Sequence, residues 1–259
     1  MNDMTVIELY EFFEKRIPKS LSEDWDNDGL MVCPDKNDTV KGVLFSLDAS
    51  EGAIEYAHQN GYNVIVTHHP LIFNKISELS GDSATSALAI KALLYKISVM
   101  SFHTRLDSVD FGVNQVLAEK IGLNNISLLE EGVNGGSIGR VGECGPQDLE
   151  GFCQKLKKDL GIYYLTVAKG SETVRKVAVV GGAGDDYIFK AADIGVDTFI
   201  TGEVHHHIFM LAKSLGINII AAGHHSTENP VLEALAKILD ENFNNSKFDI
   251  YDSNPTFSV

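Results

Sequence analysis

The most constraining feature of this sequence is a repeated alternation between short apolar runs and helix-like patterns. Residues 40–47 and 62–67 are almost entirely apolar, as in strands buried on both faces, and residues 53–60 between them have helical spacing. Gly61 separates the predicted helix from the second strand, a place where glycine commonly ends a helix. Alternation of this kind is typical of βαβ units, so we expect an α/β fold with mostly parallel sheets.

The same alternation extends along most of the chain. Residues 6–17 place apolar side chains at helical spacing, and Pro18 ends that pattern. The further predicted helices cover residues 84–95, 113–121, 148–160, 187–194, 208–215 and 230–242. The further predicted strands cover residues 97–102, 177–180, 196–201 and 217–222.

One strand–helix–strand segment resembles another segment later in the chain. Residues 41–69 align with residues 175–203 without a gap, with the same order of elements and a shared glycine before the second strand. We therefore expect two related α/β units, although any two βαβ units share some of these residues. The glycine-rich stretch 132–145 looks turn-rich and marks a boundary. We predict a first domain from residues 1–125 completed by 223–259, and a second from 126–222.

Composition excludes several classes of protein. The 259 residues contain 21 basic and 36 acidic side chains, a net charge of −15, which disfavours general nucleic-acid binding and anionic membrane surfaces. No run of about 20 apolar residues could span a bilayer, and the N-terminus has no signal-peptide pattern. The three cysteines form no CxxC pair. We expect a cytoplasmic protein.

Histidines gather just after the predicted strands. His68 and His69 follow strand 62–67, His103 follows strand 97–102, and His224 and His225 follow strand 217–222. Ligands of parallel α/β sheets bind beyond the carboxyl ends of the strands, so these histidines are expected to converge. A single histidine pair would more simply be a surface feature, but three such clusters favour a metal site.

Two of these clusters have an acid four residues after a histidine. His103 precedes Asp107 and His224 precedes Glu228 at this spacing, which puts both side chains of a pair on one helical face. Imidazoles and carboxylates without thiolates suit zinc, manganese, iron, cobalt or nickel. The sequence supplies enough of these groups for two divalent ions, with one carboxylate left to bridge them.

Other candidate groups have simpler interpretations. The turn 181–184 has neither the spacing nor the charge of a phosphate-binding loop, since two aspartates follow it, so we interpret it as a tight strand-to-helix turn. Glu203 follows strand 196–201 and is a candidate acid or base, or simply a loop carboxylate. Trp25 is expected to be a buried indole that pins the Asp- and Asn-rich loop around it.

Six motifs in order carry a resemblance to a known family. They are Trp-Asp-Asn-Asp-Gly-Leu at 25–30, Thr-His-His-Pro-Leu-Ile-Phe at 67–73, His-Thr-Arg-Leu-Asp at 103–107, Gly-Arg-Val-Gly at 139–142, Thr-Gly-Glu at 201–203 and Gly-His-His-Ser-Thr-Glu at 223–228. Together they resemble the YbgI-like dinuclear-metal-centre family, also called NGG-interacting-factor-like. Many of its members are named GTP cyclohydrolase type 2 homologues.

The resemblance implies a ligand set and an assembly. By resemblance, His69 and Asp107 would hold one ion, His68 and His224 the other, and Glu228 would bridge them, with His103 close by. It also implies a homohexamer, arranged as a dimer of trimers or a trimer of dimers. Arg105, unusual at its position, is expected to bias the pocket toward anions. His205, His206 and His207 stay outside the ligand set, and their roles remain open.

The function that follows is that of a metal-dependent hydrolase. Two divalent ions would activate a water molecule for attack on a purine ring or a similar cyclic amidine or amide, and His103 or Glu203 would move protons. The purine substrate comes from the resemblance alone. Two alternatives stay open, a two-metal phosphoesterase and a non-catalytic metal-binding protein with a regulatory or interaction role.

Overall fold

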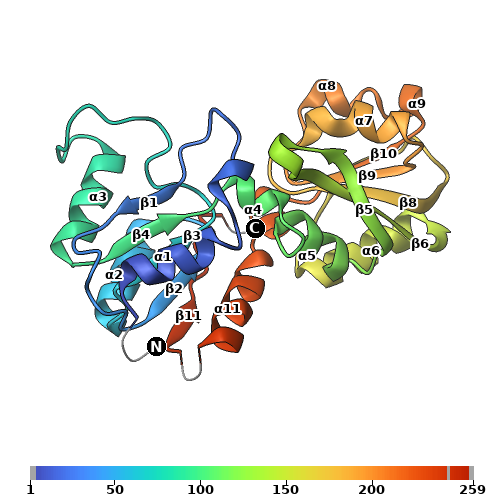
Figure 1. Cartoon of the computed structure of the whole chain (residues 1–259). Coiled ribbons are helices and arrows are strands. Elements are labelled where there is room, and N and C mark those ends of the chain that lie inside the picture. The colour runs from blue at the N-terminus through green and yellow to red at the C-terminus, as the bar shows by residue number, and fades with distance from the viewer. Residues whose placement is uncertain (1–3, 244–245, 257–259) are drawn as a thin grey trace. The chain divides into compact units, whose positions relative to one another are not determined.

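The chain folds into two compact units, each built around its own β-sheet (Figure 1). The computed structural model describes residues 4–243 and 246–256. Within these ranges, unit 1 comprises residues 4–106 and 232–256, and unit 2 comprises residues 107–231. The sequence interpretation placed the boundaries at 125/126 and 222/223; residues 1–3, 244–245 and 257–259 of its first domain lie outside the described residues.

Unit 1 contains a five-stranded sheet in the order β1-β4-β3-β2-β11, parallel except for the edge strand β1. Its strands are β1 (Gly29–Val32), β2 (Val43–Ser46), β3 (Val64–Thr67), β4 (Ser98–Ser101) and β11 (Phe248–Ile250). Its helices are α1 (Val6–Glu14), η1 (Lys19–Leu21), α2 (Glu51–Asn60) and α3 (Ala84–Leu94); α4 (Thr104–Ser108) and α11 (Val231–Asn242) cross the unit boundaries.

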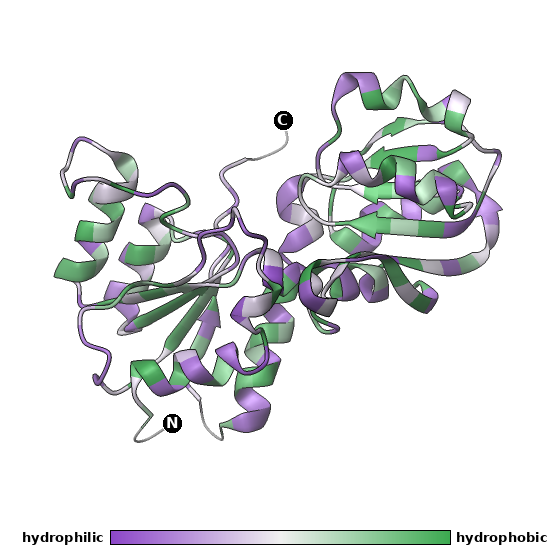
Figure 2. Cartoon of the chain, turned by 45° about the horizontal axis from the view of Figure 1, so that its top comes forward, coloured by the Kyte–Doolittle hydropathy of each residue, from purple (hydrophilic) through white to green (hydrophobic). Residues whose placement is uncertain are grey.

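Alternating side chains of this sheet pack on opposite faces. Leu44 and Ile65 contact the apolar faces of α2 and α3, whereas the Phe45 ring lies 6.3 Å from that of Phe13 on α1. Figure 2 shows these central strands as strongly hydrophobic, as expected for strands covered on both faces.

Unit 2 contains a six-stranded sheet in the order β5-β6-β8-β9-β10-β7, in which only β8, β9 and β10 are parallel neighbours. Its strands are β5 (Asn124–Glu131), β6 (Ser137–Asp148), β7 (Thr166–Ala168), β8 (Thr173–Val180), β9 (Thr198–Thr201) and β10 (Asn218–Ala221). Its helices are α5 (Val113–Lys120), η2 (Val133–Gly135), α6 (Leu149–Leu160), η3 (Asp185–Tyr187), α7 (Ile188–Asp193), α8 (His206–Phe209), α9 (Ala212–Leu215) and α10 (His224–Glu228).

The α/β fold with two related units is confirmed, and the parallel arrangement holds for most of unit 1 and for the centre of unit 2. In unit 2, Val177 and Val179 face α5 and α6, while Ala178 and Val180 face α7, α8 and α9. The interpretation of 132–145 as a turn-rich boundary is wrong. Most of it is strand β6, whose backbone is paired on both sides by β5 and β8.

The internal repeat is visible in the strand register. Val43 pairs with Val64 and Val177 pairs with Thr198, so both pairs of parallel strands have the same register at the same offset along the chain. A local side-chain contact also recurs. The Asn63 side chain accepts the Lys41 N–H at 2.8 Å, and the Asp197 carboxylate, at the equivalent place, accepts the Arg175 N–H at 3.1 Å.

Gly61 and Gly195 end the equivalent helices α2 and α7 in the same left-handed conformation. Their φ angles are +72° and +71°, so the expected helix stop at Gly61 is confirmed. A side chain with a Cβ adopts this conformation only at a steric cost. No helix in the described part of the chain is both long and apolar enough to cross a bilayer.

We expect Gly61→Ala and Gly195→Ala each to lower the free energy of unfolding by roughly 1 kcal/mol. Added bulk is not the cause, because a Cβ at Gly195 would meet nothing within 4 Å. The matched control is Gly81→Ala, an exposed glycine without a positive φ and with open space around it. Equilibrium urea unfolding measures the three variants. Equal stability of all three would contradict the conformational explanation.

Candidate metal centre

The first group of candidate ligands lies beyond the carboxyl ends of β3 and β4. These strands are parallel neighbours with Thr67 paired to Ser101, so the residues that follow them emerge at the same sheet edge. The two hydroxyls lie 2.7 Å apart, and Thr67 donates to the His69 carbonyl at 2.7 Å, which holds the strand ends together. The sequence expectation that His68, His69 and His103 converge is confirmed.

The three imidazoles are close enough to share one ion. One ring nitrogen of each of His68, His69 and His103 lies within 4.8 Å of the others. The ring centroids of His68 and His69 are 4.9 Å apart, and the His103 ring lies 5.2 Å and 5.8 Å from them. His68 is fully buried, and the other two are partly buried.

Each of these rings is oriented by an acceptor on its Nδ1 side. Nδ1 of His68 donates to the Phe102 carbonyl at 3.0 Å, Nδ1 of His69 faces Asp48 at 2.9 Å, and Nδ1 of His103 faces Asp26 at 2.9 Å. A neutral imidazole with its proton on Nδ1 carries its lone pair on Nε2. This arrangement is the one found around histidines that bind metals through Nε2, and it fits a cation at the site.

Asp26 is held in its charged form. Burial raises the pKa of this carboxyl, but hydrogen bonds from His103 and Thr104 outweigh that effect and lower the pKa to about 2. Its second oxygen accepts the Thr104 hydroxyl at 2.6 Å and the Thr104 N–H at 3.1 Å. The carboxylate is therefore a firm acceptor for His103 across the neutral pH range.

The expectation that a buried Trp25 pins this loop is wrong. The indole is 61% exposed, and the buried groups are the flanking carboxylates of Asp26 and Asp28. Asp28 accepts the His103 N–H at 3.0 Å and Arg105 Nε at 2.8 Å. Charged hydrogen bonds to α4 hold the loop, and the indole is left on the surface.

The expectation that Arg105 biases the pocket toward anions is also wrong. Its guanidinium is fully buried and is bonded to Asp28, to the Glu14 carboxylate at 2.7 Å and to the Ile17 carbonyl at 2.9 Å. Two protein carboxylates therefore balance its charge. Arg105 supports the loop and α1 and does not face a ligand.

The second group lies in unit 2, beyond the ends of the equivalent strands β9 and β10. His224 and Glu228 stand four residues apart on α10, with Nε2 and a carboxylate oxygen 3.1 Å apart. This separation is compatible with two donors that each lie roughly 2.0–2.2 Å from one ion. Nδ1 of His224 faces the Glu203 carboxylate at 2.9 Å, so Glu203 orients this ring as Asp26 orients His103.

The glycine turn at 181–184 makes room for Glu228. Gly182 has a φ of +62°, and a Cβ there would lie 2.1 Å from the Glu228 carboxylate, which is itself buried. Side chains of Asn114, Thr227 and Thr201 accept the N–H groups of residues 181, 182 and 184. This use of the amides supports the interpretation of a tight turn over that of a phosphate-binding loop.

The remaining predicted residues are placed as follows. Asp107 is half-buried on α4, and its backbone carbonyl accepts the Asn114 side chain at 3.2 Å. His205 lies outside both groups, with its Nδ1 and N–H directed at Asp185 at 2.9 Å and 2.6 Å. His206 and His207 are exposed on α8.

Two supporting residues were missed by the sequence interpretation, Asp26 and Asp48. Asp26 was noted only as part of a turn. Asp48 follows β2, so the rule used for the histidines, that polar residues after strands converge, would have found it. Neither the turn position of Asp26 nor the strand-end position of Asp48 identifies a metal-site residue by itself. Each aspartate is far in sequence from the histidine that it orients, so the pairing is seen only in the folded chain.

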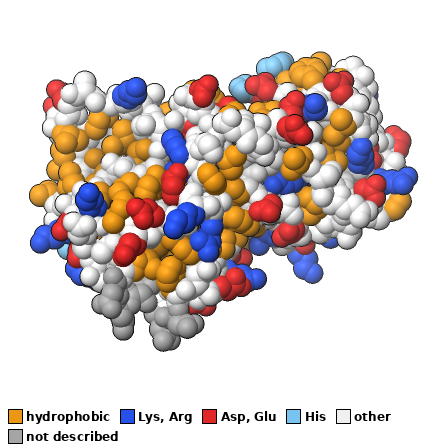
Figure 3. All heavy atoms as spheres, viewed as in Figure 1, with side chains coloured by type: hydrophobic (Ala, Val, Ile, Leu, Met, Phe, Trp, Pro, Cys, Tyr) orange, Lys and Arg blue, Asp and Glu red, His pale blue; other side chains and the backbone are white. Residues whose placement is uncertain are grey.

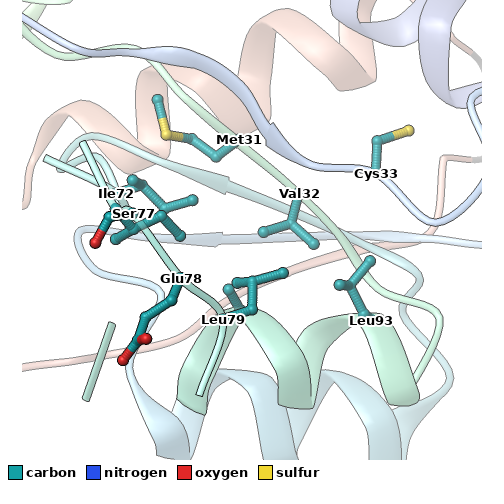
Figure 4. A pocket seen from close by; sticks show the side chains of 10 residues that line it. Met31, Val32, Cys33, Ile72, Ser77, Glu78, Leu79 and Leu93 are labelled. Carbon is teal, nitrogen blue, oxygen red and sulfur yellow. The ribbon is translucent and has the colours of Figure 1, made fainter. Parts of the chain in front are cut away.

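A cavity in unit 1 is lined by residues other than these histidines. It has a volume of about 470 Å³ and is lined by β1, α3 and the segment 72–79. Figure 4 shows mostly aliphatic side chains around it, with Ser77 and Glu78 at one side. No histidine is among its lining residues.

We expect Asp48→Asn to weaken zinc binding by the unit 1 histidines about 10- to 100-fold, the usual effect of removing such a supporting carboxylate. The amide no longer fixes His69, a candidate ligand, with its proton on Nδ1. Asp24→Asn, an exposed aspartate with the same charge change, is the matched control. Competition with a chromogenic chelator measures the affinity, and equal affinities of the two variants would contradict the orienting role.

Comparison with known proteins identifies the family of this chain. A family model described as Duf34/NIF3 (NGG1p interacting factor 3) matches residues 4–255. A Clostridium acetobutylicum protein named GTP cyclohydrolase 1 type 2 homolog is 33% identical over 242 residues, covering 92% of this chain and 90% of its own.

Solved structures share the fold over nearly the whole chain. A Staphylococcus aureus protein superposes with a TM-score of 0.92 at 26% identity, covering 99% of this chain and 100% of that one. The protein ybgI, whose function is described as unknown, superposes with a TM-score of 0.87 at 26% identity, covering 98% and 100%. This chain belongs to the Duf34/NIF3 family.

Proposed function

We propose that this protein binds two divalent cations and uses them to hydrolyse a nitrogen heterocycle or a similar cyclic amidine or amide. The observation that carries the proposal is the set of strand-end imidazoles whose Nδ1 atoms are all taken by protein acceptors. The proposed ligands are His68, His69, Asp107, His224 and Glu228, with Glu228 bridging the two ions.

The residues at these strand ends are suitable ligands for divalent cations. The donors are imidazole nitrogens and carboxylate oxygens, a set suited to zinc, iron, manganese, cobalt or nickel. In unit 2, the space around the Glu228 carboxylate exists only because residue 182 lacks a Cβ. The Glu228 side chain is buried, and its carboxylate oxygen lies 3.1 Å from Nε2 of His224, so an imidazole donor and a carboxylate donor stand side by side as a shared cation requires.

When bound, two divalent cations would supply Lewis-acid polarisation of the substrate and activation of a water molecule. The chain's own residues would orient the ligands and move protons. His103, held by Asp26 with its lone pair on Nε2, is the proposed proton carrier. Glu203 is proposed to hold His224 in place through its carboxylate. The same carboxylate is the group that would take part in proton transfer, as the sequence predicts.

The name of the relatives supports a purine nucleotide as the substrate class. A phosphoesterase would use the same pair of cations, but three of the four amides of the 181–184 turn are already bonded to protein side chains. A non-catalytic metal-binding role would need closed coordination, with no position open to water. A panel of nucleotides, cyclic amides and phosphoesters, assayed with the metal restored, distinguishes the three functions.

We expect purified protein to hold about two divalent ions per chain, and Glu228→Gln to weaken both because it removes the bridging charge. His69→Ala and His224→Ala should each empty mainly one position. His207→Ala, an exposed histidine outside both groups, is the matched control and should keep both ions. Elemental analysis after dialysis gives the stoichiometry. If Glu228→Gln retained both ions at wild-type occupancy, the bridging assignment would be wrong.

We also propose a cytoplasmic homohexamer. Three cysteines without disulfide partners agree with a reducing compartment. On the face drawn in Figure 3, acidic and basic side chains are interspersed with apolar ones. Tyr163 and Tyr164, 84% and 66% exposed beside the edge strand β7, are apolar surface that an assembly could cover.

The assembly is tested by mass. Light scattering coupled to gel filtration should give a particle of several 28.3 kDa chains at micromolar concentration, with six as the expected number. A strict monomer under these conditions would contradict the proposal. Repeating the measurement after metal removal separates assembly by the protein surface from assembly that depends on the ions.

A further inference from the structure

Two exposed aromatic rings stand beside the unit 1 histidines. Trp25 is 61% exposed and Phe73 is 46% exposed, although they lie on different loops. Their ring centroids are 6.1 Å apart in an edge-to-face arrangement, and each ring lies 6.1 Å from the His103 ring. We refer to the Trp25 and Phe73 rings together as the aromatic shelf.

The shelf is held in place by its surroundings. Asn27 donates from its side chain to the Ile72 carbonyl at 2.5 Å, which joins the two loops directly behind the rings. The residues flanking Trp25 are tied to α4, because Asp26 accepts from Thr104 and Asp28 from Arg105. The rings are therefore supported before any ligand arrives, which lowers the entropic cost of binding one.

The position of the shelf is hard to explain by stability alone. The loop is anchored by buried carboxylates, so the fold does not require the indole, and about three-fifths of this large apolar side chain faces solvent. Exposed aromatic surface beside a cluster of possible metal ligands is a common feature of binding sites.

The local chemistry restricts what the shelf could bind. The rings offer flat, electron-rich faces on which a planar ring can stack. The chain carries a net charge of −15, and the exposed Asp24 is next to Trp25 in sequence, so an anionic group at the shelf is disfavoured. An uncharged, flat aromatic ring matches both conditions, and the proposed function adds that this ring contains nitrogen.

We propose that the aromatic shelf binds the heteroaromatic ring of the substrate by stacking and holds it next to His103. The identification of the stacked ring as the substrate of a hydrolase rests on the proposed function. The stacking of a flat ring on the aromatic shelf does not depend on it. Trp25 and Phe73 act as specificity-determining residues: they select flat rings over non-aromatic compounds.

The chain contains a single tryptophan, so its fluorescence reports on the shelf alone. Guanosine and cytidine, uncharged flat probes, are titrated into the zinc-loaded full-length protein, with ribose as the non-aromatic control. We expect at least one nucleoside to quench the indole emission saturably and ribose to have no effect. Phe73→Ala should weaken the binding about tenfold, which is the typical loss of one stacked ring.

Phe189→Ala is the matched control, since Phe189 is a 51% exposed phenylalanine on α7 in unit 2. It should bind the nucleoside as the wild type does. Trp25→Leu, measured by calorimetry, should show a loss of similar size to that of Phe73→Ala. Zinc content and thermal midpoint should be unchanged in all three variants, which separates a loss of stacking from a loss of folding.

Two results would overturn the proposal. One is quenching that does not saturate with either nucleoside, or that is equal in Phe73→Ala and Phe189→Ala. The other is an indole emission typical of a buried ring that shifts to longer wavelength on dilution, because a second copy of the chain would then cover the shelf. If the protein binds zinc but shows no saturable quenching, the proposal that the shelf binds a ring is rejected and the proposed function is not. If quenching saturates but the protein binds no metal, the proposed function is rejected and ring binding by the shelf is supported.

Discussion

The ion pair between Arg105 and Asp28 is the interaction on which the unit 1 site depends. Both side chains are fully buried, and the contact joins the loop before β1 to the start of α4. The same aspartate holds the His103 N–H, and the same arginine reaches Glu14 on α1. Removing Arg105 would leave Asp28 with Lys19 as its cationic partner, and removing Asp28 would leave Arg105 with Glu14, so these charges are balanced by a network of four side chains. This network therefore holds the backbone of His103 in place, while Asp26 orients its imidazole.

The two units share one arrangement of strands and helices but place different residue types at the strand ends. In each, a parallel pair of strands with the same register delivers polar residues to a sheet edge, and a short helix follows the next strand, α4 in unit 1 and α10 in unit 2. His69 occupies the position equivalent to Glu203. Unit 1 therefore presents an imidazole where unit 2 presents a carboxylate, and in unit 2 that carboxylate orients a histidine from α10.

The elements found from sequence are those whose pattern is set by burial on both faces. Strands β2, β3, β4, β8, β9 and β10 are short apolar runs and lie at the centres of their sheets. The missed strands β1, β5, β7 and β11 lie at sheet edges, where one side of the backbone is unpaired and polar residues are tolerated. Strand β6 was missed because its glycines indicated turns, although β5 and β8 pair with it on both sides. The helix predicted over 208–215 is interrupted between α8 and α9.

The α/β fold, the internal repeat and the convergence of His68, His69 and His103 could be predicted from the sequence. They follow from local periodicity and from the rule that parallel strands end at one edge. The nitrogen of each imidazole that faces the site, the burial of Arg105 and the exposure of Trp25 could be read only from the folded chain. Each of these depends on contacts between distant segments, such as Asp26 with His103 or Arg105 with Glu14. Hydrogen bonds of this kind leave no periodic trace in the sequence, because the partners are brought together by the fold.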